Sequence, residues 1–158
     1  MPCARSVART RSASGCARVA VLDVDYHHGN GTQAIFYDRS DVFFVSLHGD
    51  PRTEYPFYLG HADERGQGAG EGYNLNLPLP RGTGFAAWRA ALAQGLQAIA
   101  RAGCDALVVS LGVDTFEADP VAGFQLRSDD YLRIGEDLAR AGLPTVFVFE
   151  GGYAVAEV

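Results

Sequence analysis

The sequence predicts an α/β fold, a parallel sheet flanked by helices, from three observations. Short apolar runs rich in Val, Phe and Leu recur along the chain and end in polar residues, which is typical of buried parallel strands. Segments of helical period lie between them, as in βαβ units. The 158 residues suffice for one domain, and 47% hydrophobic with 20% charged residues excludes a disordered or collagen-like chain.

Four apolar runs predict the strands of this sheet. They are Val19 to Asp25, Val42 to Leu47, Ala106 to Leu111 and Thr145 to Glu150. The segment from His48 to Gly82 differs, because it holds four prolines and a dense run of glycines. We expect it to be mostly loop, and a loop of this length inside a compact domain usually has a function.

Hydrophobic periodicity, together with residues typical of helix ends, predicts two helices. The first covers roughly Phe85 to Ala102, where apolar residues recur at spacings of four, four and three and Gly103 lies at the C-cap position. Its apolar stripe consists of Trp88, Leu92, Leu96 and Ile99. The second is predicted to begin at the N-cap candidate Ser128, with acidic residues in its first turn, and to end at Gly142 and Pro144.

The charge balance restricts the class of partner. Thirteen arginines, no lysine and nineteen acidic residues give a net charge of −6, which disfavours nucleic acid and anionic membranes and favours a small cationic ligand. No apolar run approaches the roughly 20 residues of a membrane span. Cys3, Cys16 and Cys104 are scattered and odd in number, so neither a disulfide framework nor a thiolate zinc site is expected. A cytoplasmic location fits these features best.

Residues 1 to 18 differ in composition from the remainder. They contain four arginines and several serines but no acidic residue. A transit peptide shares this composition, but we expect a disordered or non-native N-terminal segment. Residues 19 to 158 are then expected to hold the folded domain.

Residues with metal-ligand chemistry follow two of the predicted strands. Asp25 and His27 are two positions apart, so in an extended segment their side chains project to the same side. Asp114 follows the third apolar run, and parallel strands bring their carboxyl ends to one edge of the sheet. One imidazole and two carboxylates suit a divalent metal such as zinc. Taken singly, each aspartate is more often a turn or cap residue than a ligand.

Two further residues near these strand ends have alternative interpretations. Tyr153 follows two glycines, which permit positive φ and could carry the phenol into a cleft, where it could donate to a developing oxyanion. A surface or packing tyrosine in a turn is the alternative. His28 is expected to be structural, because a ligand at position 27 turns its neighbour away.

Several motifs in fixed order resemble a known family. They are Asp23 to Gln33, Ser110 to Pro120 and Phe149 to Tyr153, together with His48 to Phe57 and Gly68 to Asn74 in the long loop. These stretches resemble the zinc-dependent deacetylases, which include histone deacetylases and bacterial acetylpolyamine amidohydrolases. The long loop is most similar to the acetylpolyamine amidohydrolase branch.

The resemblance implies an arginase/deacetylase-like fold and a set of site residues. Zn²⁺ would be held by Asp25, His27 and Asp114, and Tyr153 would stabilise the oxyanion formed in amide hydrolysis. Tyr55 matches an aromatic residue that walls the substrate tunnel. A structural monovalent cation, usually K⁺, would use Asp23, Asp25, His27, Ser46 and the backbone carbonyl of Leu47. The implied substrate is an acetylated polyamine or acetyl-lysine, and a homodimer is one assembly to expect.

The sequence departs from this family at the general base. The family places a pair of adjacent histidines upstream of the first motif, whereas no histidine precedes His27 here; Asp23 and Asn30 match the residues that orient that pair. We therefore expect the C-terminal half of the catalytic domain, with little activity, since general base catalysis contributes roughly 10²–10⁴-fold. The alternatives are a non-catalytic metal-binding remnant or interaction module and, less favoured, an arginase-like binuclear manganese hydrolase.

Overall fold

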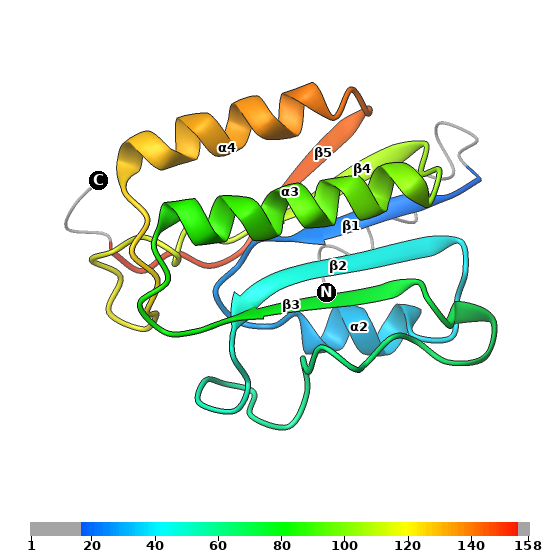
Figure 1. Cartoon of the computed structure of the whole chain (residues 1–158), viewed down its shortest axis with the longest axis horizontal. Helices are drawn as coiled ribbons and strands as arrows, with labels where there is room; N and C mark the ends of the chain where they lie inside the picture. Colours follow the sequence, from blue (N-terminus) through cyan, green and yellow to red (C-terminus); the bar gives the residue numbers. More distant parts are fainter. Residues whose placement is uncertain (1–16, 155–158) are drawn as a thin grey trace.

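The computed structural model describes residues 17–154 and contains a five-stranded sheet with helices on both faces (Figure 1). The strands are β1 (Val19–Asp23), β2 (Val42–Gly49), β3 (Asn74–Leu79), β4 (Ala106–Leu111) and β5 (Thr145–Phe149). They lie in the order β3-β2-β1-β4-β5, and every neighbouring pair is parallel. The predicted fold class is confirmed.

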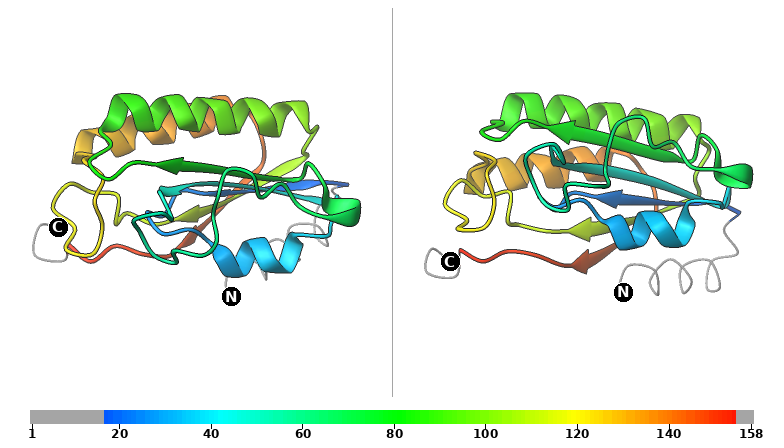
Figure 2. Two further views of the ribbon diagram at one scale, coloured as in Figure 1. Left: turned by 60° about the horizontal axis from the view of Figure 1, so that its bottom comes forward. Right: turned by 90° about the horizontal axis from the view of Figure 1, so that it is seen from below.

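Helices cover the two faces of the sheet unequally. The helices are α2 (Asn30–Phe36), α3 (Phe85–Arg101) and α4 (Ser128–Arg140), and a 3-10 turn spans Gly68–Gly70. In Figure 2, α3 and α4 lie side by side over one face, and α2 lies on the opposite face. Because β1 is central, its five residues are buried from both sides, which explains its continuous apolar sequence.

Two apolar clusters, one on each face, hold these layers together. The larger one joins the sheet to α3 and α4 and includes Leu22, Val45, Trp88 and Leu92, all of them 0–1% exposed. Gly95 lets α3 pack closely on β2, since a Cβ there would lie 3.0 Å from Val45 Cγ1. The smaller cluster lies beneath α2 and includes Phe36 and Phe44.

Several element boundaries differ from those that the sequence predicts. β3 lies inside the segment predicted to be mostly loop, and its register with β2 pairs Ser46 with Asn76. The helix α2 was not predicted, since seven residues are too few for a clear period. β1 ends at Asp23 and not at Asp25, and the N-cap of α4 is Arg127 and not Ser128.

The start of the described chain is tied to the sheet by hydrogen bonds. The backbone N–H groups of Ala17 and Arg18 donate to Asp105 Oδ2, and the Arg18 guanidinium donates to the carbonyls of Ser40 and Ala102. The predicted N-terminal segment covers residues 1–18, of which 1–16 lie outside the part of the chain that the structure describes. Within 17–154, no helix has the length and apolar character needed to span a membrane.

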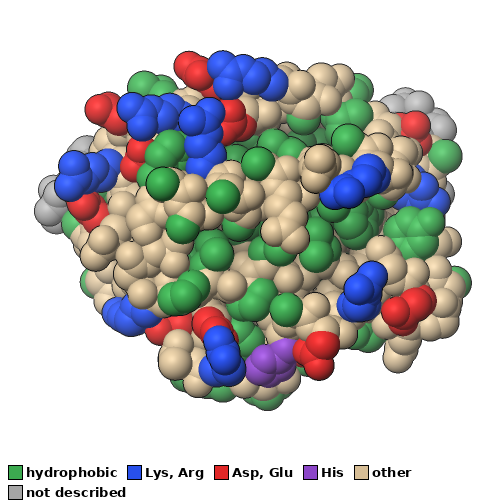
Figure 3. All heavy atoms as spheres, in the orientation of Figure 1, with side chains coloured by type: hydrophobic (Ala, Val, Ile, Leu, Met, Phe, Trp, Pro, Cys, Tyr) green, Lys and Arg blue, Asp and Glu red, His purple; other side chains and the backbone are tan. Residues whose placement is uncertain are grey.

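Besides charged side chains along its lower edge and right side, the face drawn in Figure 3 carries a group of acidic and basic side chains over α4. Acidic and basic side chains alternate there, and Arg89 on α3 pairs with Asp137 at 2.6 Å. Arg140 adds ion pairs with Glu136 and Asp137. These mixed charges form a solvated surface and identify no ligand site.

Candidate metal centre

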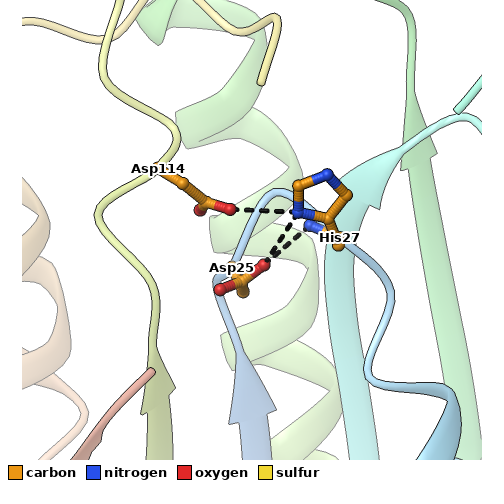
Figure 4. Close-up of side chains that lie close together, drawn as sticks. All are labelled: Asp25, His27 and Asp114. Atoms are coloured by element: carbon orange, nitrogen blue, oxygen red, sulfur yellow. Dashed lines mark hydrogen bonds and ion pairs between the residues drawn. The ribbon is translucent and has the colours of Figure 1, made fainter. Parts of the chain in front are cut away.

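Asp25, His27 and Asp114 converge at the carboxyl edge of the sheet. Because β1 pairs with β4, the segment after Asp23 runs beside the segment after Leu111. His27 Nδ1 lies 3.1 Å from Asp114 Oδ2 and 3.5 Å from Asp25 Oδ1 (Figure 4). One ligand atom from each of these residues lies within 4.8 Å of the other two. The predicted juxtaposition is confirmed.

The convergence arises from a bend and not from the extended segment that the sequence predicts. Residues 25–27 form a bend after β1, in which the His27 N–H donates to Asp25 Oδ1 at 2.8 Å. The Tyr26 N–H donates to Asp114 Oδ1 at 2.9 Å, which joins the two strand ends directly. The Asp114 side chain is 1% exposed, whereas the His27 side chain is 28% exposed. The His27 imidazole is therefore more accessible to solvent than the Asp114 carboxylate.

Two glycines allow the backbone to pass close to these carboxylates. A Cβ on Gly112 would lie 2.2 Å from Asp25 Oδ2, and one on Gly151 would lie 2.7 Å from the same oxygen. The Gly151 N–H donates to Asp25 Oδ2 at 3.2 Å. The sequence analysis did not predict this function of the two glycines, because their approach to Asp25 depends on how distant segments pack in the folded structure.

The electrostatics of the triad favour a positive charge between the carboxylates. Contacts with Asp114 and Asp25 raise the pKa of His27 to about 10. Burial raises the pKa of Asp114, whereas at Asp25 the hydrogen bonds from His27 outweigh burial and lower the pKa. A metal bound at Nδ1 would replace the proton that the two carboxylates now stabilise there.

The distances also fit a small divalent metal. Ligand atoms about 2.1 Å from a tetrahedral ion lie about 3.4 Å from one another. The 3.1 Å and 3.5 Å separations around Nδ1 are close to this value. One nitrogen and two carboxylate oxygens form a donor set suited to zinc, with a further position open to water.

Asp23 and Ser46 form a second polar pair directly below the triad. They are register partners across β1 and β2, and Ser46 Oγ lies 3.1 Å from Asp23 Oδ2. Both residues are buried, as is Leu47. Burial raises the pKa of Asp23 well above its ordinary value, although the N–H groups of Asp25 and Gly29 donate to it.

A hollow of about 330 Å³ opens beside the triad. Its lining comes from the end of β1, the start of α2 and the ends of β4 and β5 and includes Asp23, His27, Asn30, Ser110 and Glu150. Asp23 and Asn30 thus face one shared space. His28 also borders it, but its Nε2 lies 3.0 Å from Gln33 Oε1, as expected for a structural histidine.

The remaining predicted residues, Tyr55 and Tyr153, both have exposed side chains. The Tyr55 ring lies 6.3 Å from that of His27 and is 56% exposed. Tyr153 follows Gly152, whose φ of 145° is positive as predicted, and its backbone N–H donates to Asp119 Oδ2 at 2.7 Å. The Tyr153 side chain is 54% exposed. Asp119 therefore positions the segment that carries Tyr153, a contact that sequence reasoning missed.

Comparison with known proteins identifies the family. The histone deacetylase domain matches residues 3–158, which is nearly the whole chain. The chain belongs to the histone deacetylase family. It is 62% identical over 144 residues to acetylpolyamine amidohydrolase 1 of Pseudomonas aeruginosa, covering 91% of this chain and 42% of that protein.

Further relatives of this family agree in sequence and in structure. Acetylpolyamine amidohydrolase of Mycoplana ramosa is 54% identical, with 91% of this chain and 42% of the relative covered. The crystal structure of the Burkholderia pseudomallei acetylpolyamine aminohydrolase superposes with a TM-score of 0.89 at 46% identity, covering 96% of this chain and 43% of that one. The chain thus spans about two fifths of the length of these relatives.

Proposed function

We propose that this chain is part of a zinc-dependent amidohydrolase that removes acetyl groups from acetylated amines, with acetylated polyamines as the preferred substrate class. The convergence of Asp25, His27 and Asp114 is the observation that carries the proposal. The identity with proteins named acetylpolyamine amidohydrolases supports the substrate class. The net charge of −6 also favours a cationic amine.

Zinc would be held by Asp25, His27 and Asp114, and it would supply polarisation of the acetyl carbonyl and activation of a water. Two of the chain's own aromatic residues would contribute to the reaction. The Tyr153 hydroxyl would donate a hydrogen bond to the acetyl oxygen as negative charge develops on it. Such a hydrogen bond stabilises the transition state most in a site that excludes water. Tyr55 would form a wall beside the acyl chain.

Asp23, Ser46 and the Leu47 carbonyl, together with Asp25 and His27, would bind a structural K⁺. The raised pKa of Asp23 supports this proposal, because a buried carboxylate gains from a neighbouring cation. The same residue lines the hollow beside the triad, together with Asn30. We propose that both residues orient the two catalytic histidines of the family, which these 158 residues lack upstream of His27.

A non-catalytic metal-binding module is the second candidate function. The chain has four histidines, and His28 and His48 are buried and bonded to Gln33 Oε1 and to the Gly60 carbonyl. Neither is free to act as a general base at the triad. Metal binding without hydrolysis would then be the activity of the chain, with the hollow as a surface for a partner.

Hydrolysis of N-acetylputrescine by the purified, zinc-loaded chain distinguishes the two candidates. Released acetate is measured for the wild type, for Asp114→Asn and for the distant control Gly135→Ala. Chelator-sensitive release in the wild type and the control but not in Asp114→Asn supports the hydrolase. Stoichiometric zinc without acetate release supports the metal-binding module, and absence of bound zinc contradicts both.

A further inference from the structure

The loop after β2 holds Phe57 in a backbone conformation that phenylalanine rarely adopts. Its φ is 66°, and it is the one non-glycine residue with positive φ between Ala17 and Ala154. Residues with a Cβ are disfavoured in this region, most of all when the side chain is large. Burial does not offset this cost, because Phe57 is 60% exposed. Neither the backbone nor the core favours an aromatic side chain at this position.

The unusual conformation is fixed by the surrounding loop. The Glu54 N–H donates to the Asp50 carbonyl at 2.9 Å, and the Phe57 N–H donates to the Glu54 carbonyl at 3.0 Å. The Glu54 carboxylate forms an ion pair with Arg81 at 3.1 Å, which anchors this turn to the segment before α3. Strain that is held in place in this manner is typical of ligand sites.

Phe57 ends a line of rings that begins at the metal centre. The rings of His27 and Tyr55 are 6.3 Å apart at 68°, and those of Tyr55 and Phe57 are 6.3 Å apart at 84°. Both pairs have the edge-to-face arrangement that aromatic rings prefer. A substrate with its acetyl group at the triad and its chain along Tyr55 would therefore reach Phe57 with its distal end.

The ring of Phe57 is free to accept a cation from outside the chain. In the described part of the chain, arginines lie over the rings of Tyr73, Phe36 and Phe85, but over none of the exposed rings of this loop. Those rings are Tyr55, Phe57 and Tyr58. The two arginines bonded to this loop, Arg52 and Arg81, are already paired with Asp50 and Glu54.

We propose that Phe57 is a specificity-determining residue that binds the distal ammonium group of an acetylated diamine through a cation–π contact. This inference rests on the amidohydrolase function proposed above and adds the residue that selects a cationic over a neutral amide. The positive φ of Phe57 holds its ring at the end of the row of rings that is farthest from the triad. The distal end of an extended substrate would lie there.

The test compares N-acetylputrescine with its neutral isostere N-pentylacetamide. Both are titrated into the zinc-loaded chain and followed by ligand-observed NMR, in which any hydrolysis appears as free acetate. The variants are Phe57→Gly, the conservative Phe57→Tyr, and the control Phe147→Ala, an exposed aromatic residue on β5. Thermal melting of each protein is measured in parallel.

Phe57→Gly is expected to reduce the preference for N-acetylputrescine over N-pentylacetamide by about two- to fivefold, the size of an exposed cation–π contact. Its Tm is expected to stay constant or to rise by up to about 4 °C, since glycine adopts positive φ readily. Phe57→Tyr and Phe147→Ala should retain the preference of the wild type.

Three results overturn the inference in distinguishable ways. A lower Tm for Phe57→Gly with an unchanged preference makes Phe57 a packing residue and leaves the proposed function intact. Equal binding of the two amides by the wild type likewise refutes the ammonium contact alone. A wild-type chain that holds zinc but binds neither amide contradicts the proposed function, and the inference fails with it.

Discussion

Replacement of Gly112 by alanine is expected to remove metal binding without changing any ligand. The new Cβ would lie 2.2 Å from Asp25 Oδ2 and 2.7 Å from Asp25 Cα, whereas carbon contacts are optimal at about 3.5–4.0 Å. Asp25 must therefore move by about 1 Å or more. Metal–ligand distances tolerate only about 0.2 Å, so one of the three ligands is lost.

The expected magnitude is a reduction of zinc affinity by at least about 100-fold, or about 2.7 kcal/mol of binding free energy. Overpacking against the Asp25 backbone should also cost roughly 1–3 kcal/mol of folding stability. Gly151→Ala is the milder variant, because its Cβ would meet the carboxylates of Asp25 and Asp114 at 2.7 Å and 3.2 Å. It should lose zinc affinity at a smaller cost in stability.

Competition titration with a chromophoric chelator measures these affinities, and circular dichroism checks the fold. Gly135→Ala is the matched control, since a Cβ there meets nothing within 4 Å and alanine favours the helix α4. It should bind zinc like the wild type. A folded Gly112→Ala or Gly151→Ala with wild-type zinc affinity would refute the assignment of Asp25 as a ligand.

Three further predictions concern the core, the long loop and the buried thiol. Leu22→Ala should reduce the free energy of unfolding by about 2–5 kcal/mol, because Leu22 is fully buried between the sheet and α3. Urea denaturation measures this change, and a loss below about 1 kcal/mol would contradict the packing described for Leu22. Gln33→Leu should make the long loop easier for trypsin to cleave at Arg65. In the wild type, Gln33 Oε1 accepts hydrogen bonds from Asn74 and Asn76, and the Gln33 side-chain amide donates to Glu64. An unchanged cleavage rate would show that these hydrogen bonds do not restrain the loop. Burial raises the pKa of Cys104 to about 11, so little of its thiol is ionised at pH 8. In a Cys3→Ser, Cys16→Ser variant, alkylation of Cys104 in the native protein should therefore be roughly 100-fold slower than in the urea-unfolded protein. Equal native and denatured rates would show that Cys104 is not protected.

The sequence predicts the three central strands and the edge strand β5, but not the other edge strand, β3. β1, β2 and β4 are buried on both faces, so their sequences are continuous apolar runs that stand out along the chain. β3 places Asn74 and Asn76 inward, where their amide groups donate to Gln33 Oε1. Buried asparagines look like loop residues in a sequence, because the acceptor of their amide N–H groups lies some forty positions away.

The ligand set could be predicted from chemistry and strand order, but its geometry could not. Asp25 and His27 are brought together by a bend that hydrogen bonds from their own backbone maintain, and not by strand alternation. The approach of Gly112 and Gly151 to Asp25 depends on how β4 and β5 end beside β1. The positions of Tyr153 and Phe57 depend on glycine and loop conformations that no periodic pattern encodes.

X-ray absorption at the zinc edge, combined with metal analysis, tests the central claim most directly. The wild-type chain is expected to hold about one zinc, with nitrogen and oxygen ligands at about 2.0–2.2 Å and no sulfur. The Asp25→Ala, Asp114→Ala double variant should hold none under the same conditions. A wild-type zinc content in that variant, or sulfur in the coordination sphere, would contradict the assignment of the centre to Asp25, His27 and Asp114.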